Sequence, residues 1–344
     1  MNPIRFVFLD YLRIFAATSV FFGHIMSGIL TKYIDSNQFR HEHVFYWEFL
    51  SLIQYVSQMG GSGVIVFFLI SGYIITHTLQ STTANNFLIR RLFRIYPAFI
   101  VASILEYVIS SQNFEISTIL GRITLLGDFL DTPYGLGGVE WTLRVELYFY
   151  IFMYASKQFG FILNRQFPII FLAPALCLLF YDPYPSSGFA TAYINLYVPL
   201  LFMGSCVYIA QYRNDCRVLS IIVMFILYIV HIQGLIRFGK GSAYFHFLNT
   251  GIFIWFFLWY LQKLLPGGYI ITAFSNLTYS IYLFHDWTID PLFRVLNREV
   301  NVTIFVLFLI LISVLTYYIV ELPGITLGRM LTRRSIYKQS LKSL

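Results

Sequence analysis

Residues 11–26 read "YLRIFAATSVFFGHIM". The stretch is apolar enough to lie in a membrane, yet it carries Arg13 and His24. At about 100° per residue these two positions are close to three full helical turns apart, so both side chains are expected on one face, about 16 Å apart along the axis. Asp10 lies one turn before Arg13, on nearly the same side. The sequence therefore predicts a polar stripe along an apolar first helix.

The rest of the chain shares this apolar character. Of its 344 residues, 58% are hydrophobic and only 11% are charged, whereas about 25% of the residues of a soluble protein are charged. The mean hydropathy is +0.70. These values exclude an ordinary soluble domain and predict an integral membrane protein. The net charge of +7 does not indicate nucleic-acid binding, because the basic residues fall between apolar runs and in the C-terminal tail.

Apolar runs of about 20 residues, the length that crosses a bilayer as a helix, recur along the chain. We predict an all-α polytopic membrane protein with about ten transmembrane helices. The Gly-rich residues 60–63 are expected to make one helix start irregular. Residues 112–138, with Asp128 and Asp131, are predicted to form an outer loop or a re-entrant segment. The expected spans are residues 6–30, 50–79, 95–111, 139–155, 167–181, 191–211, 218–234, 246–262, 270–289 and 301–321.

A single unit is expected, with a transmembrane domain over residues 1–325 and a basic cytoplasmic tail over 326–344. We find no internal repeat and no linker to a soluble domain. The N-terminal apolar run is too long for a signal-peptide core and lacks a clear cleavage site, so it is predicted to be a retained first helix. The three cysteines (Cys177, Cys206 and Cys216) lack metal-ligand spacing and predict no disulfide framework.

The distribution of Lys and Arg predicts that both termini are cytoplasmic. With the N-terminus inside, fourteen basic residues fall on the cytoplasmic side and seven on the other, while Arg13 and Arg144 remain within spans. The cytoplasmic residues are Arg5, Arg90, Arg91, Arg94, Lys157, Arg165, Arg213, Arg217, Lys263, Arg329, Arg333, Arg334, Lys338 and Lys342. The opposite side receives Lys32, Arg40, Arg122, Arg237, Lys240, Arg294 and Arg298.

Ionisable residues within spans usually face the bundle interior or a water-filled cavity. Glu140 and Arg144 are four positions apart and can pair on one face. Glu146 needs a partner elsewhere, for which Arg13, Arg144 and His24 are candidates. A structural ion pair explains such residues as well as a functional site does, so each taken alone leaves both interpretations open.

The basic stretch over residues 87–97 also has two interpretations. The positive-inside bias explains its three arginines without any ligand. Guanidinium groups also match phosphate oxygens in a two-pronged geometry, so a phosphorylated cytosolic compound would fit. Near the outer end of the ninth span lie His285 and Asp286, and Glu321 lies at the inner end of the tenth.

Five further motifs follow the polar stripe of the first helix along the chain. These are "GVIVFFLISGYIIT" (63–76), "IRRLFRIYP" (89–97), "WTLRVE" (141–146), "YSIYLFH" (279–285) and "ELP" (321–323). Together they resemble the acyltransferase-3 family of integral membrane acyltransferases, which includes bacterial O-antigen and other glycan O-acetyltransferases. The chain departs from the family pattern at Ile65, where an acidic residue is common, and at Leu147 and Tyr148, where Glu and Gln are usual.

The resemblance implies transfer of an acetyl group from cytosolic acetyl-CoA, a co-substrate, to a hydroxyl of a cell-surface glycan or its lipid-linked precursor, such as an O-antigen or capsule unit. It implies partners of three kinds, namely acyl-CoA, the glycan acceptor and membrane lipids, with no metal and no nucleic acid. It also implies a multi-pass protein of the bacterial inner membrane. We expect no soluble hydrolase-like domain, which some members carry. Succinyl donors and small exported acceptors remain alternatives.

In this interpretation His24 is the general base, because an imidazole can take a hydroxyl proton near neutral pH. Asp10 holds the rotamer of Arg13, and Glu146 orients or charge-stabilises His24, as a carboxylate does in catalytic triads. The acyl-CoA would be bound by Arg13, Arg91 and Arg94. The acceptor would contact Trp141, Arg144 and His285.

The sequence shows no nucleophile elbow, so direct transfer in a ternary complex is predicted over a serine acyl-enzyme. The alternative function is a multi-spanning transporter or flippase of a lipid-linked or small polar substrate. Transporters often carry inverted repeats and helices broken at matched positions, and we find neither in this sequence. A non-catalytic signalling relative is disfavoured because His24 is present.

Overall fold

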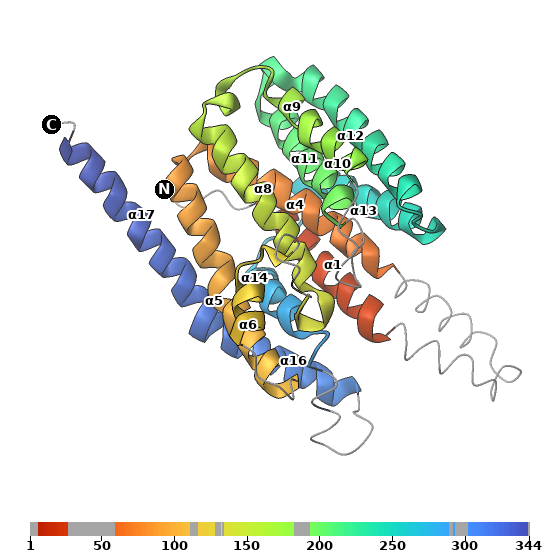
Figure 1. Cartoon of the computed structure of the whole chain (residues 1–344), viewed down its shortest axis with the longest axis vertical. Coiled ribbons are helices and arrows are strands. Elements are labelled where there is room, and N and C mark those ends of the chain that lie inside the picture. The colour runs from red at the N-terminus through yellow and green to blue at the C-terminus, as the bar shows by residue number, and fades with distance from the viewer. Residues whose placement is uncertain are drawn as a thin grey trace, which may run out of the picture.

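The computed structural model describes residues 6–26, 59–110, 116–127, 132, 134–181, 193–288, 292 and 302–342. Within these ranges the chain forms helices and turns and no strand, which confirms the all-α prediction (Figure 1). Helices overlap every expected span, and six of the helices in the described part of the chain are long and apolar enough to cross a membrane. The number of ten spans and the cytoplasmic termini stay predictions. Outside the described residues lie Arg5, Lys32, Arg40, Asp128, Asp131, Arg294 and Arg298, as do the side chains of Arg334, Lys338 and Lys342.

The elements that build the interior and the site come from both halves of the chain. They are α1 (Val7–Phe21) with the π-helical turn η1 (Phe22–Met26), α4 (Gly60–Gln80), α5 (Ala84–Ser110), α8 (Glu140–Gln158), α11 (Tyr193–Tyr212) and α14 (Tyr269–Phe284). Around them lie α6 (Ile116–Ile123), α9 (Phe167–Ile170), α10 (Leu172–Phe180), α12 (Arg217–Arg237), α13 (Ser242–Tyr260), α16 (Val302–Thr316), η6 (Tyr317–Glu321) and α17 (Leu322–Lys342).

Helix α4 is the centre of the packing, because it contacts α1, α11 and α13. At its crossing with α11, a Cβ atom on Gly72 would overlap the carbonyl oxygen of Leu201, and one on Gly204 would overlap that of Leu69. Such pairs of small residues let two membrane helices approach closely. Gly63, near the beginning of α4, serves the same purpose against α1, since it faces the backbone of Ala16. The expected irregular start is therefore a helix start that packs on α1.

Helix α5 begins eleven residues before the expected span, at Ala84 rather than residue 95. The backbone carbonyl of Thr83 accepts from the amide of Phe87 at 2.9 Å, and its hydroxyl accepts from the amide of Asn86 at 3.4 Å. The first is the opening bond of the helix, and the second uses an amide that a helix start leaves free. The basic stretch that was expected to be a connection therefore forms the first turns of α5. Its arginines are held on a rigid helix.

The expected basic tail is also helical. Beyond Glu321 the chain continues as α17, which lies along α5 (Figure 1). Gly324 and Gly328 face Pro97 and Phe93 of α5. The division of the chain into a transmembrane domain over residues 1–325 and a tail over 326–344 stays a prediction.

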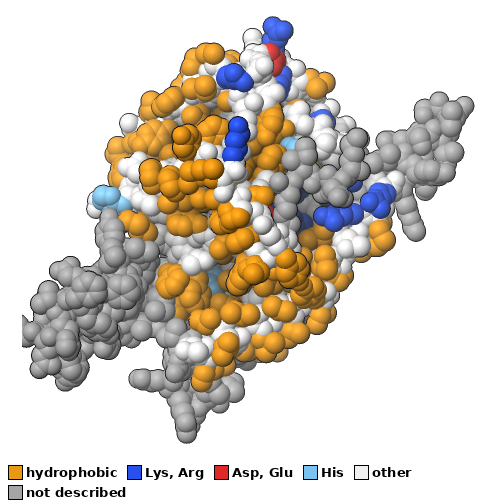
Figure 2. Space-filling view, turned by 180° about the vertical axis from the view of Figure 1, so that it is seen from behind, with side chains coloured by type: hydrophobic (Ala, Val, Ile, Leu, Met, Phe, Trp, Pro, Cys, Tyr) orange, Lys and Arg blue, Asp and Glu red, His pale blue; other side chains and the backbone are white. Residues whose placement is uncertain are grey.

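Hydrophobic side chains cover most of the face shown in Figure 2, and charged side chains are sparse on it. Large apolar residues point outward from the peripheral helices, among them Phe225 and Ile229 on α12 and Leu307 and Leu311 on α16. Soluble proteins rarely expose such continuous apolar surface. This face therefore fits contact with lipid tails.

Candidate functional site

One face of α1 and η1 lines two neighbouring cavities. Arg13 and Val20 border a cavity of about 290 Å³, and Val20 and His24 border another of about 490 Å³. The other α1–η1 residues at these walls are Ala16, Ala17 and Gly23. Their spacing of three, four and seven positions is that of one helix face. The expectation that Arg13 and His24 lie on one face is confirmed.

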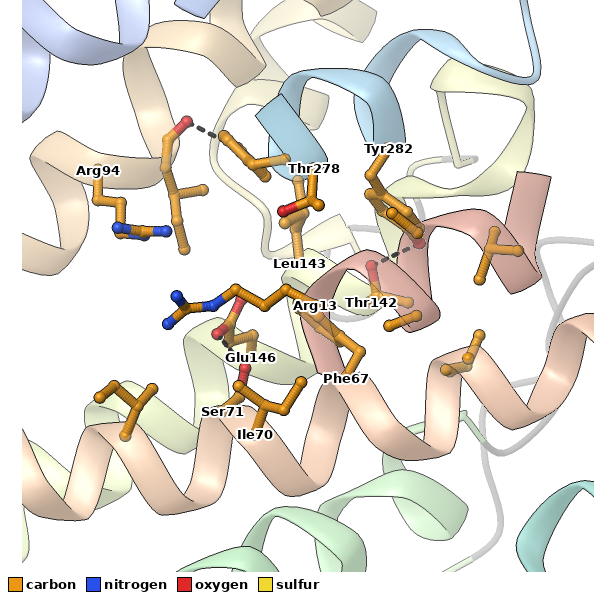
Figure 3. Close-up of a pocket in the computed structure, with 18 of the residues that line it drawn as sticks. Arg13, Phe67, Ile70, Ser71, Arg94, Thr142, Leu143, Glu146, Thr278 and Tyr282 are labelled. Atoms are coloured by element: carbon orange, nitrogen blue, oxygen red, sulfur yellow. Dashed lines mark hydrogen bonds between the residues drawn. The ribbon is translucent and has the colours of Figure 1, made fainter. Parts of the chain in front are cut away.

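The cavity bordered by Arg13 is here called the arginine cavity. It is lined by Arg13, Arg91 and Arg94 together with Glu146. Figure 3 shows Arg13 extending beside Glu146, with Arg94 on the opposite wall. Apolar side chains such as Phe67 and Leu143 form much of the remaining lining. Three cations against one carboxylate give the cavity a positive character that suits an anionic ligand.

Arg13 is held from within its own helix. Its Nη1 lies 3.3 Å from Oδ1 of Asp10, and the hydroxyl of Ser275 on α14 donates to the same oxygen at 2.7 Å. Asp10 is only 2% exposed and lines neither cavity. This contact is the one expected of a residue that fixes the rotamer of Arg13, and Asp10 itself borders neither cavity.

Arg91 and Arg94 differ in the partners that they contact within the protein. Arg91 donates to the hydroxyl of Thr78 at 2.8 Å and lies over the ring of Tyr150. Among the described residues Arg94 forms no ion pair within 4.0 Å. Unlike Arg13, it therefore has no carboxylate partner at ion-pair distance among these residues.

Glu146 does not reach His24. It accepts a hydrogen bond from the hydroxyl of Ser71 at 2.8 Å and lies in the arginine cavity, whereas His24 lines only the other cavity. The prediction that Glu146 orients His24 is therefore wrong on geometric grounds. Helix α8 points the residue toward the arginines, and a spacing pattern within one helix cannot show which neighbouring helix it will face.

The second cavity, here called the histidine cavity, has an aromatic wall and is bordered by His24. Trp141 stacks on Tyr193 with ring centroids 4.1 Å apart and planes within 17°. His24 lies in η1, where the helix widens to a π-helical turn, a distortion that is frequent at functional sites. Behind Tyr193, burial lowers the pKa of Lys240, whose Nζ is 5.8 Å from the Tyr193 ring centre.

His24 is hydrogen-bonded to the segment that follows α14. Its Nδ1 is 3.0 Å from Nε2 of His285 and 3.5 Å from Oδ1 of Asp286. The His24 side chain is 45% exposed and faces the cavity, while His285 is 1% exposed and lines neither cavity. The structure thus places His285 behind His24 and not at the acceptor surface that the sequence suggested.

The two cavities meet at three residues that line both, Val20, Val64 and Tyr282. The hydroxyl of Tyr282 is 2.8 Å from that of Thr142 and donates to the carbonyl of Val139 at 3.0 Å (Figure 3). These bonds tie α14 to the beginning of α8. The arginines and His24 therefore border two adjoining cavities that share part of their lining, here together called the passage.

A sequence model of the acyltransferase-3 family, described as an acyltransferase domain, matches residues 6–321. The chain belongs to the acyltransferase-3 family. The matched region is an acyltransferase domain, and this membership favours the enzyme over the transporter alternative. The chain is also 28% identical over 167 residues to Nodulation protein 10 of Rhizobium leguminosarum bv. viciae, a match covering 41% of each chain. The match thus spans about two fifths of that relative. No solved structure matches.

Arg144 is buried away from both cavities. Its Nε donates to Oε1 of Glu140 at 2.8 Å and its Nη2 to the carbonyl of Thr132 at 3.0 Å, and its guanidinium lies over Tyr134. The pairing of Glu140 with Arg144 is confirmed. The structure gives Arg144 no access to a ligand, because its side chain is 1% exposed.

Several residues of the acyltransferase site were not singled out from the sequence. Tyr282 lies three positions before His285, and Ser71 lies within the motif over residues 63–76, so helical spacing within known motifs could have indicated both. Tyr193 carries no such signal. Its place opposite Trp141 depends on how α11 packs against α8.

Proposed function

We propose that this acyltransferase moves an acetyl group from acetyl-CoA to a hydroxyl of a cell-surface glycan or its lipid-linked precursor. One observation carries the proposal. A single face of α1 and η1 presents Arg13 to one cavity and His24 to another, and the two cavities share the wall at Val20. Transfer between two separately bound substrates needs a donor site and an acceptor site side by side, and a cationic cavity adjoining one that holds an imidazole meets that need.

The donor half of the proposal rests on the arginine cavity. Guanidinium groups bind phosphate oxygens with charge-assisted hydrogen bonds, and Arg91 and Arg94 would take the nucleotide end of acetyl-CoA. Arg13, on the wall formed by α1, would hold a phosphate or the acyl carbonyl. The apolar lining at Phe67 and Leu143 would then accommodate the less polar arm of the donor.

The acceptor half rests on the histidine cavity. The imidazole of His24 takes the proton of the acceptor hydroxyl as its oxygen attacks the thioester carbonyl carbon. The C–O bond forms, the C–S bond breaks, and the imidazolium returns its proton to the departing thiolate. The stacked rings of Trp141 and Tyr193 offer an apolar wall on which the face of a sugar ring can lie. Transfer is direct, with no acyl-enzyme.

The test is transfer of labelled acetyl from acetyl-CoA to surface polysaccharide in isolated membranes. Wild type is compared with His24→Ala and with His246→Ala, a matched control on the exposed side of α13, at equal expression. We expect the His24 variant to lose transfer by about 10²-fold or more, and the His246 variant to remain at the wild-type rate.

Equal transfer by His24→Ala and wild type would show that the base lies elsewhere. Absence of transfer by wild type from acetyl-CoA, but transfer from succinyl-CoA under the same conditions, would correct the donor and keep the mechanism. Label recovered in protein rather than in polysaccharide would contradict direct transfer.

A further inference from the structure

The hydrogen bonds of His285 determine where its own proton lies. Its Nδ1 is 2.8 Å from the backbone carbonyl oxygen of Tyr282, one turn earlier in α14. A carbonyl oxygen can only accept, so the hydrogen must be on Nδ1 of His285. A second proton on Nε2 would create a buried cation whose two hydrogen-bond partners are both uncharged, which is costly. His285 is therefore neutral, with a lone pair on Nε2.

The lone pair on His285 then determines the proton of the next ring. Nε2 of His285 is 3.0 Å from Nδ1 of His24, and the two rings are partly stacked with centroids 5.0 Å apart. Since Nε2 of His285 can only accept, Nδ1 of His24 must donate. A neutral His24 held in this way carries its own lone pair on Nε2, the nitrogen that is not bonded to His285.

We propose that His285 is a positioning residue that fixes His24 in the tautomer able to act as a base. The inference rests on the proposed function, since it assigns His24 Nε2 as the atom that accepts the acceptor's proton. It replaces the sequence-based assignment of Glu146 to this part. A second hydrogen bond that fixes the tautomer of an imidazole is how its reactive nitrogen is usually selected.

Asp286 supplies the charge that His285 lacks. Its Oδ1 is 3.5 Å from Nδ1 of His24, and its side chain is 30% exposed. Among the described residues at the histidine cavity it is the one carboxylate. When His24 takes up the acceptor proton on Nε2, its Nδ1–H faces both this carboxylate and neutral His285. His285 sets the starting tautomer, and Asp286 stabilises the charged state that follows.

The experiment compares two amide substitutions of His285 in the full-length protein. In His285→Asn the amide can still donate to the Tyr282 carbonyl, but it is too short to replace Nε2. In His285→Gln the longer side chain can place its amide oxygen near the former Nε2 and accept from His24. The two variants differ by one methylene group and by which hydrogen bond they keep.

We measure kcat and KM for acetyl-CoA in the labelled-acetyl assay, with thermal unfolding in detergent as a check on folding. His285→Asn is expected to lower kcat by about 10²-fold or more, the size of a lost base, with KM for acetyl-CoA unchanged. His285→Gln is expected to recover at least tenfold of that loss. Asp286→Asn should lower kcat to an intermediate level.

Full activity in His285→Asn, or equal loss in the Asn and Gln variants when both remain folded, would overturn the assignment. Unfolding of His285→Asn alone, with His285→Gln folded and no more active than His24→Ala, would also overturn it. Failure of the proposed function looks different, because His24→Ala would then be as active as wild type.

Discussion

Arg13 donates its hydrogen bond to Asp10 from one turn further along the same helix, so a buried carboxylate determines where a cavity-lining guanidinium points. The same carboxylate oxygen accepts from Ser275, which connects α1 to α14. A fixed guanidinium loses less freedom when it binds a phosphate than a mobile one does. Asp10 is therefore expected to affect the affinity for acetyl-CoA more than the chemical step.

We expect Asp10→Asn to raise KM for acetyl-CoA roughly tenfold while kcat changes by less, because a hydrogen bond to a charged group contributes about 1.5–3 kcal/mol. Steady-state kinetics in membranes measure both constants. Ser275→Ala is the milder companion and should raise KM only about threefold. A fall in kcat with KM unchanged would mean that Asp10 acts on the chemical step.

Glu146→Gln is expected to lower KM for acetyl-CoA several-fold. The amide oxygen can still accept from Ser71, but the one negative charge found at the described lining of the arginine cavity is removed, which favours an anionic ligand. The difference from wild type should shrink as salt is raised, because screening weakens it. A loss of kcat as large as that of His24→Ala would instead support the original assignment of Glu146 to His24.

Trp141→Ala should raise KM for the acceptor roughly tenfold and leave KM for acetyl-CoA unchanged. The substitution removes one ring of the stacked pair at the histidine cavity, and aromatic stacking contributes about 0.5–1.5 kcal/mol beyond the buried area. Trp141→Phe should be closer to wild type. Equal effects on donor and acceptor would indicate that the wall supports the passage rather than the acceptor.

Arg144→Met is expected to act on stability and not on substrate binding. It leaves the carboxylate of Glu140 buried without its partner, which costs about 3–5 kcal/mol. Thermal unfolding in detergent should show a large drop. Combining Glu140→Gln with Arg144→Met should recover part of it, since no unpaired charge remains. A stable Arg144→Met with impaired acceptor KM would restore the residue to the acceptor site.

The sequence predicted features that depend on one helix and could not predict those that depend on two. The stripe from Arg13 to His24 and the pair of Glu140 with Arg144 follow from helical spacing, and both are found. The partner of Glu146 depends on how α8 turns relative to α1, and no spacing rule contains that rotation. The partners of His24 come from residues 261 and 262 positions later in the chain, so only the packing of α1 against α14 reveals them.

The early beginning of α5 shows a different limit. Hydropathy recognises the lipid-crossing part of a helix and misses its polar first turns. Arg91 and Arg94 therefore seemed to lie on a connection, although they are carried by the same rigid helix that continues through Pro97. Helix start signals at Thr83 were the available clue.

The π-helical turn at Phe22–Met26 makes chain length itself a determinant of this site. A π-helical turn accommodates one residue more than the α-helical turn it replaces. Deleting a single residue before His24 in this turn would let it return to regular α-helical winding and change the direction of His24 relative to Arg13. The imidazole would then move away from His285 and Asp286, although every side chain of the passage is still present. Insertions and deletions in this turn should be as damaging as loss of the imidazole.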